Sequence, residues 1–300
     1  MPYYTPLRYP GGKRRLTPAI KYLLEKNRLK DIEYAEPYAG GAAIALSLLM
    51  EEYASVIHIN DLSRPVYAFW YSVFNSTEEL CQRIESVEVT MVEHTRQRGI
   101  YSNQGTATLL DLGFSAFFLN RTNRSGIMTG GVIGGKNQSG PWLLDARFNK
   151  KELIQRIRRI GRYRHRVRLY QMDGLDFTNK VISLMPSSAF IFYDPPYIES
   201  GEALYLNTYD INDHRRLAAR IVQLEQLWAV TYDEAAMRHR LYESCRRITY
   251  QLSYSAQTRY GGKEVMFVSQ HIELPKAWYS STPVPLAPST GSKVLMGIAH

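Results

Sequence analysis

The order of strand-like and helix-like segments constrains the fold of this 300-residue chain more than any other feature. Residues 32–36 and 56–60 read as apolar strands, and residues 42–50 between them read as a helix with an apolar face. A glycine-containing loop follows the first strand and Asp61 closes the second, which is the pattern of a βαβ unit. Because such a unit joins parallel strands, the sequence predicts an α/β fold with a mainly parallel twisted sheet and helices on both faces.

Strand and helix patterns resume in the second half of the chain after a long interruption. Further strands are expected at residues 167–172, 189–193, 227–232, 248–255 and 265–271. The interruption is mostly helical, but residues 120–142 are rich in Gly, Asn, Arg and Ser, which indicates a loop or hairpin. We therefore expect a sheet domain of residues 1–66 and 162–274, an inserted smaller lobe of residues 67–161, and a tail of residues 275–300.

The composition is that of an ordinary globular protein with a basic surface. Hydrophobic residues make up 45% and charged residues 22%, and the formal net charge of +9 favours a polyanionic partner such as nucleic acid. No apolar run approaches the roughly 18 residues that cross a bilayer, and no secretory signal pattern is present, so we expect a cytoplasmic protein without a membrane segment. Cys81 and Cys245 lack metal-ligand spacing, and no other cluster predicts a metal site.

A chemically distinctive corner follows the strand expected at residues 189–193. Asp194, Pro195, Pro196 and Tyr197 stand there in sequence, and the prolines fix the backbone in extended geometry. The Asp194 carboxylate and the Pro195 carbonyl can therefore be held as two acceptors for a flat amine, with the Tyr197 ring as a stacking face. Hydrogen bonds to the amine hydrogens make a delocalised nitrogen more reactive, so the corner predicts chemistry on such an amine. A strand end with a rigid turn is the alternative reading.

Two features near the first strand predict a nucleoside-binding half-site. Residues 36–41, EPYAGG, follow that strand, and the missing glycine side chains let a ligand approach the backbone. Asp61 lies about twenty residues after the glycines, where an acid can hold two ribose hydroxyls. A plain tight turn with a capping acid remains the other interpretation.

Motifs in a fixed order give the chain a family resemblance. They are RYPGGK at residues 8–13, EPYAGG at 36–41, ND at 60–61, FFLNRTNRSGI at 117–127 and DPPY at 194–197. In this order, over residues 6–270, the sequence resembles the DNA adenine methyltransferases of the Dam class, the D12 family. The resemblance implies a Rossmann-like methyltransferase fold and a transfer of a methyl group from S-adenosylmethionine (SAM), without a metal. The implied acceptor is the exocyclic amine of an adenine flipped out of double-stranded DNA.

The resemblance also implies roles for single residues. Asp194, Pro195, Pro196 and Tyr197 would hold the target amine and its ring. The residues implied in cofactor binding are Tyr9 and Lys13 in the first loop, Glu36, Tyr38, Gly40 and Gly41 on the methionine side, Asp61 at the ribose, and Asp176 and Phe177 near the cofactor's adenine. The last pair also reads as a helix cap and a core residue.

DNA contacts are expected from the insertion and from a late turn. The predicted contact residues are Arg121, Asn123, Arg124, Ser125 and Lys136 in the insertion, and Arg259 and Lys263 beside the glycines of a hairpin. That hairpin is otherwise a plain surface turn. A run of seven arginines between Arg156 and Arg168 is either a further phosphate contact or a solvated helix face.

Three positions depart from the family pattern. Ala42 stands in place of a third glycine, Tyr9 in place of another aromatic type, and Thr129 where relatives that read GATC have an arginine, which argues against GATC as the recognition sequence. Other hypotheses stay open: methylation of an amine in RNA or of a protein glutamine, cytosine as a minor target, and a DNA-binding relative without catalysis. We expect a monomer, either an orphan enzyme or one that works beside a cognate restriction enzyme or other defence-system subunits.

Overall fold

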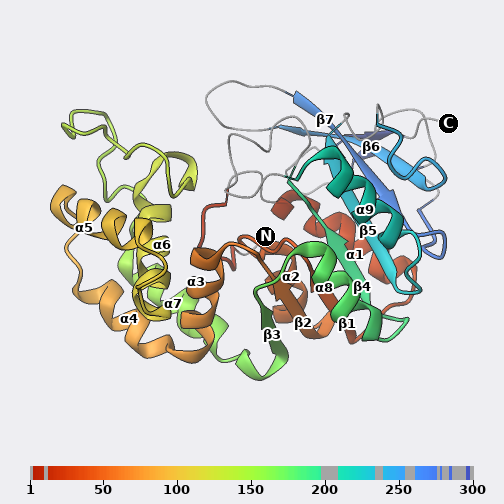
Figure 1. Cartoon of the computed structure of the whole chain (residues 1–300), viewed down its shortest axis with the longest axis horizontal. Coiled ribbons are helices and arrows are strands. Elements are labelled where there is room, and N and C mark those ends of the chain that lie inside the picture. The colour runs from red at the N-terminus through yellow and green to blue at the C-terminus, as the bar shows by residue number, and fades with distance from the viewer. Residues whose placement is uncertain are drawn as a thin grey trace.

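One sheet and a cluster of helices beside it make up the chain (Figure 1). The computed structural model describes residues 3–9, 13–196, 209–233, 239–253, 261–275, 278, 284–285 and 295–297. Tyr197 and Arg259, both predicted site residues, lie outside these ranges, and of Lys263 only the backbone is described.

The sheet is mainly parallel, as the sequence predicts. Among the described residues it has nine strands in the order β3-β2-β1-β4-β5-β7-β6-β9-β8. Their bounds are β1 Ile32–Glu36, β2 Ala54–Asn60, β3 Val167–Tyr170, β4 Phe190–Tyr193, β5 Leu227–Asp233, β6 Arg246–Ser253, β7 Gly261–Val268, β8 Val284–Pro285 and β9 Leu295–Gly297. Strands β1 to β5 pair in parallel, and β7 enters antiparallel between β5 and β6. This is a Rossmann-like sheet with an antiparallel edge.

Helices cover both faces of the sheet and also form the cluster beside it. Their bounds are α1 Thr17–Lys26, α2 Ala43–Met50, α3 Arg64–Asn75, α4 Thr77–Ser86, α5 Met91–Ser102, α6 Leu109–Thr122, α7 Lys150–Gly161, α8 Gly174–Lys180 and α9 Ile211–Ile221. In Figure 1, α4 to α7 lie on the left, away from the sheet, and α3 lies between them and β2. Helix α3 packs against α6 and α7, so the long interruption between β2 and β3 forms one helical cluster.

The order of the strands reverses beside β1. This strand pairs with β2 on one side and with β4 on the other, although β4 comes much later in the chain. Helix α2, which follows β1, packs in one core cluster, and Leu217 of α9, which follows β4, packs in the other. The chain therefore leaves β1 and β4 toward opposite faces, and a crevice is expected between the two strand ends.

The alternation of side chains in β4 explains why the sheet has two cores. Phe190 and Phe192 pack in the cluster with α1, α2 and α3, whereas Ile191 and Tyr193 pack in the cluster with α8 and α9. All four side chains are buried. A strand buried on both faces reads as a continuous apolar run, which is how this strand appears in the sequence.

The Gly- and Arg-rich stretch after α6 is a series of turns. One antiparallel bridge between Asn123 and Val132 closes it, and a 3-10 turn spans Arg124–Gly126. Of the two predicted forms, a loop and a two-stranded hairpin, the structure has the loop with a single bridging pair. In Figure 1 these turns project from the top of the helical cluster.

The chain beyond residue 274 was expected to be a tail without regular structure. Two short strands lie within it, β8 and β9, and β9 pairs with β6 at the edge of the sheet. Trp278 is also buried, with 1% of its surface exposed, against the core that includes Ile20. In the described part of the chain, no helix has the length and apolar character needed to cross a membrane.

Candidate active site

The loop after β1 and the acid after β2 meet at the carboxyl end of the sheet. The backbone N–H of Gly40 donates to Oδ2 of Asp61 at 2.9 Å, and the N–H of Ser63 donates to Oδ1 at 2.9 Å. Trp70 of α3 also fixes the loop, because its indole N–H donates to the Gly40 carbonyl at 2.8 Å. Burial raises the pKa of Asp61 to about 6, although both amide hydrogen bonds lower it.

Gly40 meets two demands that only glycine satisfies here. Its φ is +46°, in the left-handed region, and an added Cβ would lie 2.6 Å from the ring of Tyr9. Gly41 is also close to Tyr9, whose Cβ would lie 3.0 Å from a Cβ at that position. The structure therefore brings Tyr9, Gly40, Gly41 and Asp61 together, as the sequence predicts.

Glu36 lies at the end of β1 beneath this loop. Its Oε1 accepts hydrogen bonds from the Tyr34 hydroxyl and from the backbone N–H of Ala45, both at 2.9 Å. Only 5% of its surface is exposed, and this burial raises the pKa of the carboxyl to about 8. Glu36 is therefore mostly protonated at neutral pH, unless a cation lies beside it.

Asp194 directly follows β4, and one of its two oxygens is held in place. Oδ1 accepts from the Thr231 hydroxyl at 2.8 Å and lies 3.3 Å from Nζ of Lys13. Within the described residues, Oδ2 has no hydrogen-bond or ion-pair partner, which leaves it as a free acceptor. Burial raises the pKa of Asp194, and the Lys13 ammonium and the Thr231 hydroxyl oppose this shift.

Lys13 lies between two carboxylates. Its Nζ is 3.3 Å from Asp194 Oδ1 and 3.7 Å from Oε1 of Glu264, a residue of β7. Lys13 is 6% exposed and Glu264 is 2% exposed, so both are buried, whereas the Asp194 side chain is 23% exposed. Neither Thr231 nor Glu264 was predicted as a site residue; the available signal was a polar residue within an otherwise apolar strand.

Tyr38 contacts the start of α8 through a second tyrosine. Its hydroxyl donates to the Tyr209 hydroxyl at 3.1 Å, and the Tyr209 hydroxyl donates to Oδ2 of Asp173 at 2.5 Å. The other oxygen of Asp173 caps α8 by accepting from the N–H of Leu175 at 2.9 Å. An added Cβ on Gly174 would overlap the Tyr38 hydroxyl, so the close approach requires glycine.

The predicted pair Asp176 and Phe177 is not brought to this place. Phe177 is fully buried in the core, with its ring centroid 5.0 Å from that of Tyr170. Asp176 is exposed and forms an ion pair with Lys180 at 2.9 Å. The core reading describes Phe177, but the cap reading of Asp176 is wrong: the acid that caps the helix and faces the tyrosines is Asp173. The helix begins at Gly174, which places Asp173 rather than Asp176 at its cap.

Sequence comparison identifies the family of this chain. The family model for D12 class N6 adenine-specific DNA methyltransferase matches residues 9–257, which is most of the chain. The chain belongs to this family. It is an adenine-specific DNA methyltransferase, a class for which SAM is the implied methyl donor and DNA the implied substrate.

Solved structures of low similarity also match. One is the ribosomal RNA methyltransferase AviRa from Streptomyces viridochromogenes, with 13% identity, coverage of 88% of this chain and 87% of that chain, and a TM-score of 0.37. Another is a Legionella pneumophila protein with 16% identity, coverage of 85% and 82%, and a TM-score of 0.31. The search of curated proteins gave no match.

Two of the predicted DNA contacts of this methyltransferase are internal hydrogen-bonding residues. Asn123 is fully buried, and its Nδ2 donates to the carbonyls of Ile127 and Met128 at 3.0 and 2.8 Å. Its Oδ1 lies 2.8 Å from Nε2 of His94. Arg121 donates through Nε to the Arg147 carbonyl at 2.6 Å. All the polar side-chain atoms of Asn123 are used in contacts within the turns and with His94, whereas Arg121 is only partly buried.

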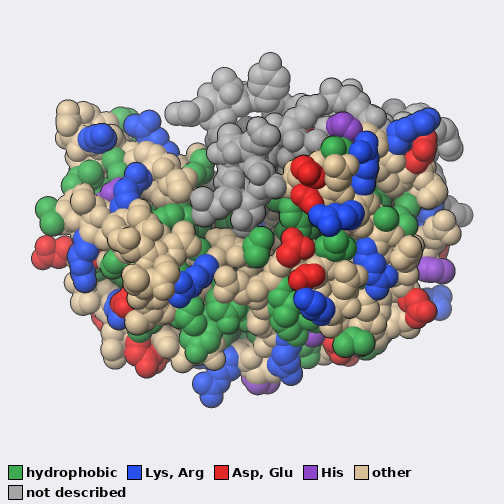
Figure 2. Space-filling model, in the orientation of Figure 1, with side chains coloured by type: hydrophobic (Ala, Val, Ile, Leu, Met, Phe, Trp, Pro, Cys, Tyr) green, Lys and Arg blue, Asp and Glu red, His purple; other side chains and the backbone are tan. Residues whose placement is uncertain are grey.

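Other predicted DNA contacts are exposed. Arg124, Ser125 and Lys136 all lie at the surface of the turns, and Ser125 has a positive φ of 56° that turns the chain outward. Figure 2 shows Lys and Arg side chains on the upper left part of the molecule, where Figure 1 places these turns, whereas Asp and Glu side chains of the helical cluster lie lower. This surface suits a polyanion.

Asn120 joins these turns to the loop that precedes Lys13. Its Oδ1 accepts from the N–H of Arg8 at 2.8 Å, and its Nδ2 donates to the carbonyls of Arg8 and Gly126 at 2.9 and 2.8 Å. Gly126 packs so closely that an added Cβ would overlap the Arg8 carbonyl oxygen. The backbones of the two segments are therefore in direct contact.

The predicted arginine run divides into paired and clustered residues. Arg158 forms an ion pair with Glu78 at 2.7 Å, and Arg166 forms one with Glu52 at 3.0 Å. These pairs support the solvated-face reading for that part of the run. Arg156 instead faces the amino-terminal segment and donates to the Thr5 carbonyl at 2.9 Å.

Arg156 belongs to a group of guanidinium side chains around Tyr3, which we call the arginine cluster. Its members are Arg8, Arg14, Arg121, Arg147 and Arg156. The Tyr3 ring lies between Arg14 and Arg156, at 4.5 and 4.7 Å from their guanidinium carbons. Burial, followed by the charge of Arg8, lowers the pKa of Arg121 to about 10. Within the cluster, Arg156 forms an ion pair with Glu152.

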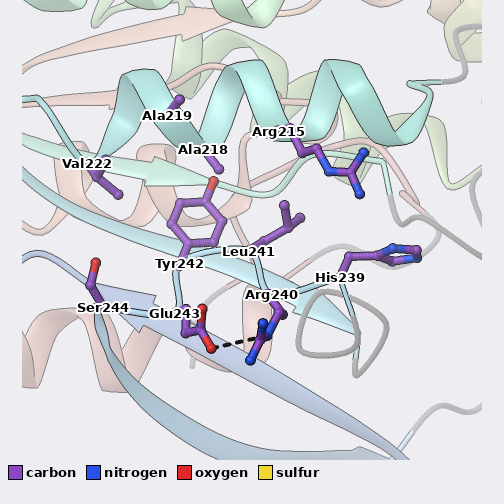
Figure 3. A pocket seen from close by; sticks show the side chains of 10 residues that line it. All are labelled: Arg215, Ala218, Ala219, Val222, His239, Arg240, Leu241, Tyr242, Glu243 and Ser244. Atoms are coloured by element: carbon purple, nitrogen blue, oxygen red, sulfur yellow. Dashed lines mark ion pairs between the residues drawn. The ribbon is translucent and has the colours of Figure 1, made fainter.

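A separate hollow of about 540 Å³ lies between α9 and the turn before β6 (Figure 3). Its lining includes Arg215, His239 and Tyr242, and Arg240 forms an ion pair with Glu243 there at 3.2 Å. No residue of the predicted site lines it. Within the described part of the chain, no group of three His, Cys, Asp or Glu side chains is arranged to hold a metal.

Proposed function

We propose that this methyltransferase transfers a methyl group from SAM to the exocyclic amine of an adenine that is flipped out of duplex DNA. The observation that carries the proposal is the state of Asp194. One carboxylate oxygen is held by Thr231 and Lys13, and the other, at the carboxyl end of β4, has no partner among the described residues. Ligands of open α/β sheets bind at this edge, where the strand order reverses.

The residues beside β1 and β2 fit the cofactor. SAM has two ribose hydroxyls and an ammonium that carboxylates can bind, and a sulfonium methyl that is the electrophile. The crevice has carboxyl groups and a glycine backbone without side chains. We assign Asp61 to the ribose and Glu36 with Tyr38 to the methionine side, where Gly40 and Gly41 leave room. The carboxyl of Glu36 would ionise beside a bound cation, because an opposite charge lowers a raised carboxyl pKa.

The target amine would be activated by position rather than by prior deprotonation. Asp194 Oδ2 and the Pro195 carbonyl accept its two hydrogens, and Tyr197 stacks on the base. The new carbon–nitrogen bond forms as the donor's carbon–sulfur bond breaks, which leaves the nitrogen positively charged and acidic. Its proton then passes to Asp194, whose raised pKa makes it a better acceptor than an exposed carboxylate.

Duplex DNA would lie across the exposed turns after α6. An amine inside a duplex is out of reach of the crevice, so the base must leave the stack. We assign contacts to Arg124, Ser125 and Lys136 on these turns, and phosphate contacts to the arginine cluster, whose guanidinium groups an anion can bind. Residues 67–161 would thus act as the target-recognition part, and Arg259 with Lys263 would add further contacts. Thr129 makes a recognition sequence other than GATC the expectation.

The test is to sequence DNA with base-modification detection from a methylation-free host that expresses the chain. Asp194→Ala serves as the inactive variant, and Glu79→Ala, which changes an exposed acid of α4, serves as the control. We expect N6-methyladenine in one short motif with wild type and the control, and none with Asp194→Ala. Unmodified DNA with soluble wild-type protein, or equal modification by all three, would contradict the proposal.

A further inference from the structure

We propose that Glu264 is a positioning residue for methyl transfer, which holds Lys13 beside Asp194 so that the free carboxylate oxygen faces the target amine. The inference rests on the proposed function, in which Asp194 binds that amine. It assigns a role to a residue of β7, far from the family motifs in the sequence.

Each oxygen of Glu264 has a defined neighbour. Oε2 accepts from the Tyr250 hydroxyl at 2.7 Å, and Oε1 lies 3.7 Å from Nζ of Lys13. Tyr250 and Glu264 are directly paired residues of β6 and β7, so their side chains extend from the same face of the sheet. The antiparallel entry of β7 beside β5 thus brings a fixed carboxylate to the Lys13 ammonium.

Lys13 needs such a fixed partner to act on Asp194. A lysine side chain is flexible and its ammonium has no fixed direction for its contacts, so a buried carboxylate on one side restricts where the ammonium lies. With Glu264 on one side, the ammonium stays 3.3 Å from Oδ1 of Asp194. Thr231 binds the same oxygen, and two donors on Oδ1 prevent the carboxylate from rotating. The geometry then leaves Oδ2 as the oxygen for the amine.

Glu264 also changes the electrostatic effect of Lys13 on the Asp194 carboxylate, because its own negative charge offsets part of the ammonium charge. The ionisable groups around Asp194 come from five elements: Lys13 precedes α1, Tyr34 and Glu36 lie on β1, Tyr232 on β5, Tyr250 on β6 and Glu264 on β7. Glu264 adds a second negative charge beside Lys13. Negative charge favours the amine as it becomes cationic during the reaction.

A role in charge balance alone would be a different conclusion. A buried ammonium and carboxylate stabilise each other, so removal of Glu264 lowers stability in either case. Only the positioning role makes the reaction depend on Glu264 through Lys13. The readout must therefore be the rate per folded molecule and its pH profile, with stability recorded separately.

The experiment measures single-turnover methylation of duplex DNA by Glu264→Gln, Lys13→Met and the double variant, with SAM affinity and thermal stability in parallel. Glu33→Gln is the matched control, because it removes a strand carboxylate that pairs with His58 at 3.0 Å instead of with Lys13. We expect Glu264→Gln to lower the rate on the order of 10- to 100-fold with little change in SAM affinity. The double variant should be no slower than Lys13→Met, and the control should keep the wild-type rate.

The pH profile gives a second criterion. In Glu264→Gln one carboxylate beside Lys13 is lost and its negative charge no longer opposes ionisation of Asp194, so the acid limb of the rate should move to lower pH. In Lys13→Met it should move to higher pH, because the cation that favours the carboxylate is absent. An unchanged rate and acid limb in folded Glu264→Gln, or losses that add fully in the double variant, would overturn the inference. Inactive wild type would instead show that the proposed function is wrong.

Discussion

Replacement of Glu36 by glutamine should make the protein more stable than wild type at alkaline pH. Glu36 is 5% exposed, and burial raises the pKa of its carboxyl from 4.5 to about 8. Between these two values the native state binds more protons than the unfolded state, so the free energy of unfolding falls as pH rises. Glutamine has no such titration, and its Oε1 keeps the hydrogen bonds from Tyr34 and Ala45.

The magnitude follows from the two pKa values. With 4.5 in the unfolded chain and about 8 in the folded one, the contribution of this carboxyl to the free energy of unfolding falls by about 2.7 kcal/mol between about pH 6 and pH 9. Other groups also titrate in this range, but both proteins contain them, so they cancel in the difference. We expect similar stabilities near the lower pH and a more stable Glu36→Gln near the upper one.

Urea unfolding followed by tryptophan fluorescence at constant ionic strength measures this difference. The midpoint and the slope of each transition are recorded at each pH, because an unchanged slope shows that the same surface unfolds. A stability difference between wild type and Glu36→Gln that stays constant over this pH range would refute the reasoning. It would mean that Glu36 is ionised in the folded protein and has a compensating partner.

Three other outcomes follow from the site. Asn123→Ala should lower the free energy of unfolding by about 3 kcal/mol, because His94 and two carbonyls lose a buried partner; an unchanged melting temperature would contradict this structural role. Arg124→Gln should reduce the slope of log affinity for DNA against log salt by about one, whereas Arg158→Gln, which removes an ion-paired arginine, should not; equal slopes would contradict the assignment. SAM binding near neutral pH should release a proton from Glu36, which calorimetry in buffers of different ionisation enthalpy measures. If the Glu36→Gln variant releases the same number of protons, Glu36 is not their source.

The sequence predicts the parts of the site that depend on strand ends. β1 spans the residues expected for it, and Asp61 and Asp194 follow their strands as predicted. Apolar runs that stop at glycine, proline or an acid mark such ends reliably, because the terminating residue and the hydrophobic pattern indicate the same boundary. Parallel strands then bring their ends to one edge of the sheet, which is enough to expect the crevice.

The residues that the sequence did not predict act across the sheet. Thr231 and Glu264 contact Asp194 and Lys13 only because β5 and β7 lie beside each other, and the register of that pairing is not encoded locally. The prediction for Asn123 was based on its polarity. The sequence does not show whether such an amide is exposed to DNA or buried against backbone carbonyls. The cap at Asp173 was missed because the start of a seven-residue helix is set by packing against Tyr38 and Tyr209.

The clamp formed by Asn120 has a consequence for how specificity changes during evolution. This one amide fixes both the loop before Lys13 and the turn at Gly126, so a substitution there disturbs the reaction centre together with the DNA-facing surface. Residues 129–138 lie beyond the clamp, and the hydrogen bonds of Asn120 do not involve them. New recognition sequences should therefore arise by replacement and length change within residues 129–138, while Asn120 and Gly126 stay invariant. Lineages of this enzyme would diversify at the tip of the turns and conserve their base.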